Sequence, residues 1–168
     1  MTDTSLIGVA GGRIQPERAD RLFDEAKEVA SRLGVEILLM DAEMVFGKAH
    51  LDSAVVHAFR AFERGTNVAD TRMMEVMLYA SGERQLSTAI KKMGVKEGTT
   101  RVAVVVSEVT KLDAVLSGLK VERDDAVLEG DVESLVRFGI SRQTIHDTPE
   151  ERRIDLVLER VAVVDMLK

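Results

Sequence analysis

The segment 57–106 constrains the fold of this 168-residue chain more than any other part of it. Three runs with helical spacing of apolar residues pass through or lie within this segment, over residues 51–64, 67–81 and 83–93. Their apolar positions recur with the 3.6-residue period of helices that bury one face. A short loop then leads into an unbroken apolar strand at 102–106, which is typical of a strand covered on both faces. The pattern predicts a helical layer packed against a sheet.

The remaining segments alternate between short apolar runs and helical periods. We predict further strands at 6–10, at 35–40 and within 121–128, and further helices at 16–33, 111–116, 131–138 and 149–164. This order predicts a single α/β domain over residues 1–168, with a small three- or four-stranded central sheet packed by six or seven helices.

The composition excludes several classes of site. The chain has no cysteine, which rules out disulfides, thiol catalysis and cysteine-ligated zinc. No run approaches the roughly 18 apolar residues that a transmembrane helix requires, and the N-terminus does not resemble a signal peptide. We therefore expect a cytoplasmic protein with no membrane segment.

The titratable residues do not form a recognisable catalytic or metal-binding motif. His50 and His57 are two helical turns apart, too far to share a zinc ion easily, and we interpret them as solvated side chains. The sequence Gly8-x-x-Gly11-Gly12 follows a predicted strand and precedes a helix, so a phosphate could bind there, although a plain tight turn is the favoured interpretation. We expect no catalytic residue, no metal and no cofactor.

Charge is unevenly distributed along the chain. The net charge is −6, yet residues 57–101 carry eight Lys/Arg against five Asp/Glu, a local net charge of +3. An acidic protein with one basic face can bind a polyanion at that face. A chance fluctuation explains the charge pattern equally well at this point.

Two places in the middle segment combine polar residues with helical signals. Glu75 lies within a mostly apolar helix, where a buried carboxylate needs a partner, and Arg72 or Tyr79 is close enough along the helix to provide one. Asn67 is the predicted N-cap of this helix. At the next corner, Gly82 allows a sharp turn and Arg84 lies beside the free N–H groups of a helix start, where an anion could bind.

These residues also carry a family resemblance. The resemblance is carried by His57-Ala58-x-Arg60-Ala61, Gly65-x-Asn67-Val68-Ala69 and Glu75-x-x-Leu78-x-x-Ser81-Gly82-x-Arg84-Gln85-Leu86, followed by Gly94-Val95 before a valine strand. Together these elements are similar to the small kinase-associated regulatory subunit of the KEOPS (EKC) complex, the TPRKB-like family. The resemblance covers about fifty residues well. Its most specific element is Ser81-Gly82-x-x-Gln85 after the helix of Glu75.

The resemblance implies a non-enzymatic accessory protein. Such a subunit binds the protein kinase of a complex that installs threonylcarbamoyl on tRNA adenosine, and in microbial relatives it captures the single-stranded CCA end of the tRNA. The implied tRNA-binding residues are Arg60, Arg64, Arg84, Lys91 and Lys92. Two alternatives stay open: a small enzyme that binds a phosphorylated metabolite at Gly11-Gly12, and a purely protein-binding scaffold.

Overall fold

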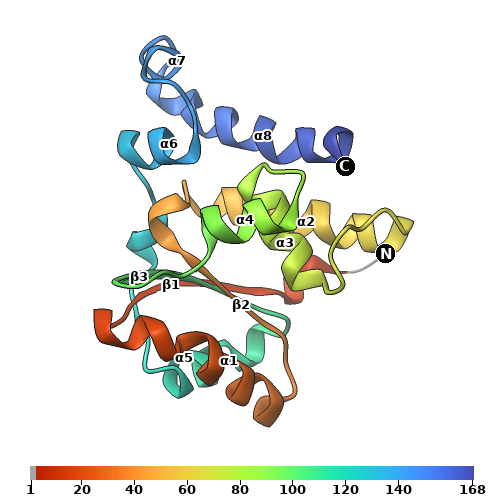
Figure 1. Ribbon diagram of the computed structural model, residues 1–168, viewed down its shortest axis with the longest axis vertical. Coiled ribbons are helices and arrows are strands. Elements are labelled where there is room, and N and C mark those ends of the chain that lie inside the picture. The colour runs from red at the N-terminus through yellow and green to blue at the C-terminus, as the bar shows by residue number, and fades with distance from the viewer. Residues whose placement is uncertain (1–2) are drawn as a thin grey trace.

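A computed structural model describes residues 3–168 as a four-stranded antiparallel sheet with helices on both faces (Figure 1). The strands are β1 (Gly8–Arg13), β2 (Ile37–Asp41), β3 (Arg101–Val106) and β4 (Glu122–Arg123). The α-helices are α1 (Ala19–Leu33), α2 (Lys48–Arg64), α3 (Arg72–Ser81), α4 (Leu86–Met93), α5 (Leu112–Gly118), α6 (Val132–Phe138), α7 (Arg142–His146) and α8 (Arg153–Leu167). Short 3-10 helices connect several of them.

The sheet has the order β2-β3-β1-β4, so β3 is an interior strand. Alternate residues of β3 point to opposite faces of the sheet. Val102, Val104 and Val106 contribute to the core on one face, whereas Ala103 and Val105 contribute to the core on the other. The continuous apolar run of β3 therefore reflects burial on both faces, as predicted from the sequence.

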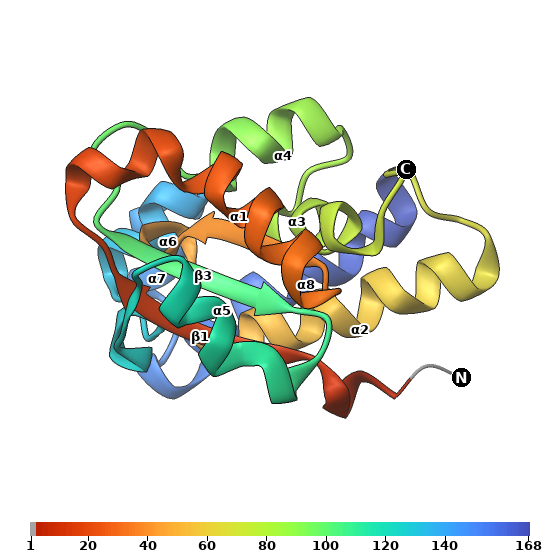
Figure 2. The same cartoon turned by 90° about the horizontal axis from the view of Figure 1, so that it is seen from below.

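The two faces of the sheet carry different helical layers (Figure 1). Helices α1 and α5 cover one face. Helices α2, α3 and α4 cover the other, with α3 between α2 and α4 (Figure 2), and α8 packs on the side of α2 and α3 that faces away from the sheet. A smaller apolar cluster joins α6 and α7 to the first half of α8. Helix α3 lies at the centre of the thicker layer, which explains why most of its residues are apolar and buried.

The α/β class and the small four-stranded sheet are confirmed. The described residues form eight α-helices, because the short helix α7 follows α6 after a turn that the sequence pattern did not mark. The predicted strand within 121–128 contains only β4 (Glu122–Arg123), since residues 125–128 form a 3-10 helix.

The predicted turn at Gly11-Gly12 is wrong, because both glycines lie inside β1. Packing explains why they are glycines. A Cβ on Gly11 would lie 2.7 Å from Val127, and one on Gly12 would lie 2.2 Å from Val121. The N–H of Gly11 already donates to Asp125 Oδ1 at 3.0 Å. The site proposed for a phosphorylated metabolite is therefore filled by the chain itself.

The helix ends were predicted with mixed success. Helix α6 begins after Asp131 in a capping box and ends at Gly139, as predicted. The predicted N-cap Asn67 is wrong: α3 begins five residues later, and Thr71 caps it by accepting from the N–H of Met74 at 3.2 Å. The helix predicted at 149–164 begins later, because Glu150–Arg152 form a 3-10 turn and α8 starts at Arg153.

Candidate functional site

The five predicted tRNA-binding residues fall into two groups on either side of α3. Arg60 and Arg64 lie on α2, whereas Arg84 precedes α4 and Lys91 and Lys92 lie on it. Figure 2 shows α3 between these two helices. The two groups therefore come from different helices, and each is described by its own contacts.

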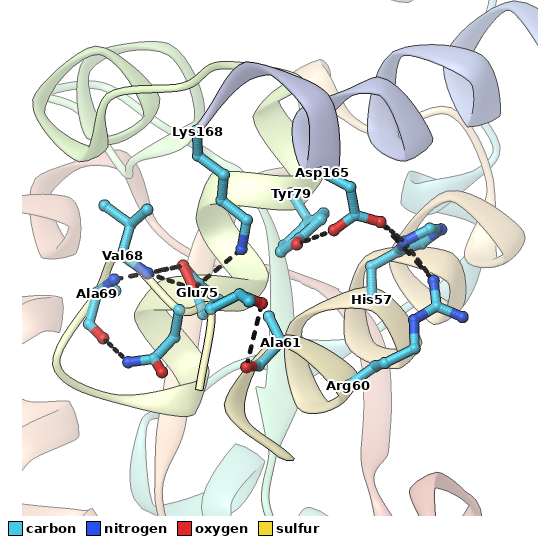
Figure 3. Close-up of polar contacts among 11 residues, drawn as sticks. His57, Arg60, Ala61, Val68, Ala69, Glu75, Tyr79, Asp165 and Lys168 are labelled. Carbon is cyan, nitrogen blue, oxygen red and sulfur yellow. Dashed lines mark hydrogen bonds and ion pairs between the residues drawn. The ribbon is translucent and has the colours of Figure 1, made fainter. Parts of the chain in front are cut away.

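Arg60 belongs to a polar network at the end of α8 (Figure 3). Its Nη2 lies 2.8 Å from His57 Nδ1 and 3.9 Å from Asp165 Oδ2. Asp165 also accepts from the Tyr79 hydroxyl and lies 3.2 Å from His57 Nδ1. The His57 ring stacks on Tyr79 with centroids 5.4 Å apart. Arg60 is thus held by the protein and is less available to a ligand than its position on α2 suggested.

Burial and hydrogen bonding shift the titration of this network. Desolvation raises the pKa of Tyr79, and its hydrogen bond to Asp165 raises it further. Desolvation pushes the pKa of Asp165 upward, but hydrogen bonds from Tyr79 and His57 outweigh it and leave the pKa lowered. Asp165 is therefore an ionised acceptor and Tyr79 a neutral donor at physiological pH.

Lys92 is also engaged by the protein. Its Nζ donates to the Ser81 carbonyl at 2.7 Å, lies 3.4 Å from Glu83 Oε1, and lies 4.0 Å from the centroid of the Phe138 ring. Only 17% of the side chain is exposed. Desolvation lowers the pKa of Lys92, and the nearby Glu83 opposes that shift. These contacts give Lys92 a structural role at the C-terminal end of α3.

The other three cations are exposed. Arg64, Arg84 and Lys91 all have solvent-accessible side chains, and within residues 3–168 none of them has an acidic partner at ion-pair distance. Arg84 lies at the corner between α3 and α4, Lys91 lies in the last turn of α4, and Arg64 ends α2. Exposed and unpaired guanidinium and ammonium groups can contact phosphates at little desolvation cost.

The Ser81-Gly82 corner is rigid. The Ser81 hydroxyl donates to the Leu78 carbonyl at 2.7 Å and accepts from the N–H of Glu83 at 3.0 Å. Gly82 has φ of +73°, and a Cβ there would lie 3.3 Å from the Cβ of Arg160 on α8. Gln85 is exposed and occupies the N-cap position of α4 without a side-chain hydrogen bond. The corner therefore presents Arg84 from a fixed backbone.

Glu75 has the structural role predicted for it, but with different partners. The carboxylate is fully buried and accepts from the N–H of Val68 at 2.9 and 3.0 Å and from the N–H of Ala69 at 3.3 Å. Lys168 Nζ lies 3.8 Å from Glu75 Oε2 (Figure 3). Neither Arg72 nor Tyr79 provides the predicted hydrogen bond. Asn67 contributes to the same loop by donating from its amide to the Ala69 carbonyl at 3.0 Å.

His50 is buried, so its interpretation as a solvated residue is wrong. Its Nδ1 accepts from the N–H of Phe46 at 3.1 Å, and its Nε2 lies 2.7 Å from the Ala80 carbonyl. These two contacts require a neutral ring that carries its proton on Nε2. Desolvation lowers the pKa of His50 to about 4. His50 therefore joins the start of α2 to the end of α3. Its place beside Leu51, on the face that also contains Ala54, was a sequence signal for burial.

The sequence analysis missed a group of residues on α8. Val163, Met166 and Leu167 are exposed, whereas Asp165 and Lys168 in the same turns point into the network described above. Ile90 on α4 is also 43% exposed. The helix predicted at 149–164 ended before Met166 and Leu167, so these two residues were not placed on it.

The described helices include none with the length and apolar character of a transmembrane segment. Across residues 3–168, no group of three or more histidine and carboxylate side chains is placed to hold a metal ion. What the helical layer presents is a cationic corner at α3–α4 and an apolar end of α8, which are features of a protein that binds other macromolecules.

Comparison with known proteins assigns this binding protein to a family. The model of the family described as kinase binding protein CGI-121 matches residues 20–165, and the chain belongs to that family. A curated relative, the regulatory protein Cgi121 of Methanocaldococcus jannaschii, is 28% identical over 165 residues, covering 97% of this chain and 98% of the relative. The resemblance to the kinase-associated regulatory subunit is thus confirmed.

Proposed function

We propose that this protein is a non-enzymatic accessory subunit of a cytoplasmic KEOPS complex for tRNA threonylcarbamoyladenosine modification. It binds the protein kinase of that complex and the 3′ CCA end of tRNA. Membership of a kinase-binding family supports the first contact. The exposed Arg84 at the α3–α4 corner and the exposed Lys91 on α4 support the second.

The observation that carries the RNA contact is the exposed Arg84 at the α3–α4 corner, with Lys91 further along α4, both without acidic partners among the described residues. A short single-stranded end has few phosphates, so a few cations suffice, and the acidic remainder of the protein disfavours other RNA. Arg64 lies across α3, and Arg60 and Lys92 are held by Asp165 and Glu83. We therefore assign the main RNA contact to the α3–α4 corner.

The test compares two RNAs and two charge reversals in a mobility-shift assay. We expect intact tRNA to bind and tRNA trimmed of its last three nucleotides to bind much more weakly. Arg84→Glu should weaken binding of intact tRNA about tenfold or more, because it removes a phosphate contact and adds repulsion. Arg21→Glu, an exposed site on α1 across the sheet, is the matched control and should have no effect.

Two outcomes contradict the proposal. Equal binding of intact and trimmed tRNA would remove the CCA end as the ligand. Equal affinity of the Arg84→Glu and Arg21→Glu variants would remove the α3–α4 corner as the site. A purely protein-binding scaffold predicts that no RNA binds while the kinase still does.

A further inference from the structure

A polar cleft of about 300 Å³ lies at the end of β1, beside the turn that leads from α5 into β4. It is lined by Arg13, Ile14, Gln15, Thr100, Lys120 and Glu122. The side chains of Gln15, Thr100 and Lys120 belong to exposed residues and have no hydrogen-bond or ion-pair partner within residues 3–168. Several donors and acceptors of the cleft are therefore free to bind a ligand.

Lys120 has a backbone conformation that a lysine seldom adopts. Its φ is +55°, and no other residue except glycine has a positive φ in the part of the chain that the structure describes. The N–H of Lys120 donates to the Ser117 carbonyl at 3.1 Å, and that of Val121 donates to the Leu116 carbonyl at 2.9 Å. This is the hydrogen-bond pattern of a helix end at which glycine is the usual residue, because a side chain there strains the backbone. A strained residue on the wall of a cleft indicates that its side chain serves a ligand.

Arg13 is the second cation of the cleft. Its Nε donates to Asp124 Oδ2 at 2.9 Å, whereas neither of its Nη atoms has a partner among residues 3–168. Arg101 lies directly opposite Arg13 in the register of β1 and β3. Two like charges opposite each other on neighbouring strands repel, so a bound anion beside Arg13 would be stabilising.

The carboxylates near the cleft restrict what kind of anion can bind. Glu122 lies opposite Arg13 in the register of β1 and β4, and Asp124 holds the Arg13 Nε. Two carboxylates therefore accompany the two cations, which disfavours an extended polyanion such as RNA. A compact anion can contact Lys120 and Arg13 together without bringing further negative charge close to Glu122 and Asp124.

We propose that this cleft binds a phosphate group, either free or as the monoester of a small molecule. A phosphate monoester has three terminal oxygens and a charge of about −1.5 to −2 near pH 7. Lys120 and Arg13 provide charged donors, and the Gln15 amide and the Thr100 hydroxyl provide neutral ones. The cleft is small and mostly polar, so the phosphate is the main group that it recognises. The site goes beyond the proposed function, because it is formed by β1, β4 and the end of α5 and does not include the α3–α4 corner.

The experiment titrates the full chain with inorganic phosphate, adenosine monophosphate and adenosine in a calorimeter. We expect saturable binding of inorganic phosphate, of the monophosphate or of both, and no binding of adenosine. Binding of the monophosphate alone would identify a phosphate ester as the ligand, whereas equal binding of the two would identify the free ion. A chain that binds neither phosphate compound would overturn the inference.

Three substitutions locate the site in the same assay. Lys120→Asn removes the charge but keeps a residue that tolerates positive φ, and it should weaken phosphate binding at least about tenfold. Glu122→Gln removes a competing carboxylate and should tighten binding. Lys27→Gln, at an exposed position of α1 outside the cleft, is the control and should leave the affinity unchanged. Equal affinities of the Lys120→Asn and Lys27→Gln variants would overturn the inference.

A fourth substitution separates a role in binding from a role in the fold. Lys120→Gly relieves the backbone strain, so it should raise the urea midpoint of unfolding while it weakens phosphate binding. A lower midpoint together with unchanged phosphate affinity would show that the lysine serves the fold, and the inference would be overturned. If Lys120→Asn weakens tRNA binding and the wild-type chain binds neither phosphate compound, the cleft is an RNA contact and the inference is again overturned.

Discussion

The two ends of α3 are both held by buried polar groups, but by different chemistry. At the N-terminal end, the negative charge of Glu75 faces backbone N–H groups and Lys168. At the C-terminal end, a neutral His50 and the cation Lys92 bind the carbonyls of Ala80 and Ser81. Both arrangements agree with the helix dipole, which favours negative charge at the start and positive charge at the end.

The difference lies in what each end connects. Glu75 joins a loop and the end of α8, two segments that expose apolar side chains. His50 and Lys92 join α2 and α4 to α3, within the helical layer. Because α3 is apolar and buried, its polar contacts are concentrated at its two ends. The contacts at the N-terminal end also connect two segments that expose apolar side chains. Three substitutions test this difference between the two ends of α3.

The largest effect is expected from Glu75→Ala. The change leaves the N–H groups of Val68 and Ala69 and the ammonium group of Lys168 without their partner in a buried site. Removing one member of a buried charged pair costs about 3 to 5 kcal/mol of unfolding free energy. Urea denaturation measures it. Glu83→Ala, at the opposite end of α3 and on a partly exposed ion pair, should cost less than about 1 kcal/mol. Equal losses for the two variants would contradict the asymmetry between the ends.

A pH-dependent effect is expected from His50. Its folded pKa of about 4 lies below the usual value of 6.5, because burial disfavours the charged ring. The unfolded chain then binds the proton more readily, so the stability from His50 is complete above pH 6.5 and is lost as the pH falls toward 4. The loss amounts to about 3 kcal/mol, from about 1.4 kcal/mol per pKa unit.

The measurement for His50 compares urea denaturation of the wild-type chain and His50→Gln between pH 7 and pH 4. Glutamine can donate to Ala80 and accept from Phe46 without titrating. The variant should therefore lose less stability than the wild type as the pH falls. Parallel stability curves for the two proteins would show that His50 does not titrate as its burial requires.

The smallest effect is expected from Thr71→Ala. This change removes the side-chain cap of α3, a contact at an exposed position. Loss of a threonine N-cap costs about 1 kcal/mol. Thermal or urea denaturation should give a value well below that of Glu75→Ala. A loss as large as that of Glu75→Ala would mean that the cap, and not the buried carboxylate, holds the N-terminal end.

The sequence predicted the layers better than it predicted the contacts between distant residues. The apolar run of β3 and the periods of α2 to α4 follow from burial, which affects every residue of an element. Glu75 was recognisable as a carboxylate inside an apolar helix, but its partners are backbone groups of a preceding loop and Lys168, which spacing along the helix does not reveal.

The same limit explains the errors at the candidate site. Asp165 lies close to Arg60, and Glu83 lies close to Lys92, only in the folded chain. Five cations were therefore predicted to be available to RNA, whereas three are exposed and unpaired among the described residues. His50 was assigned by residue type although its position on the buried face of α2 pointed the other way. The exposed residues Met166 and Leu167 lie beyond the helix predicted at 149–164, so the sequence pattern did not place them on α8.

The most direct test of the account measures kinase binding and tRNA binding for the wild-type chain and Arg84→Glu side by side. If the α3–α4 corner binds the CCA end and the kinase binds a different surface, Arg84→Glu loses tRNA and keeps the kinase. A folded Arg84→Glu variant that keeps tRNA, or that loses both ligands, would contradict the assignment of the RNA contact to this corner.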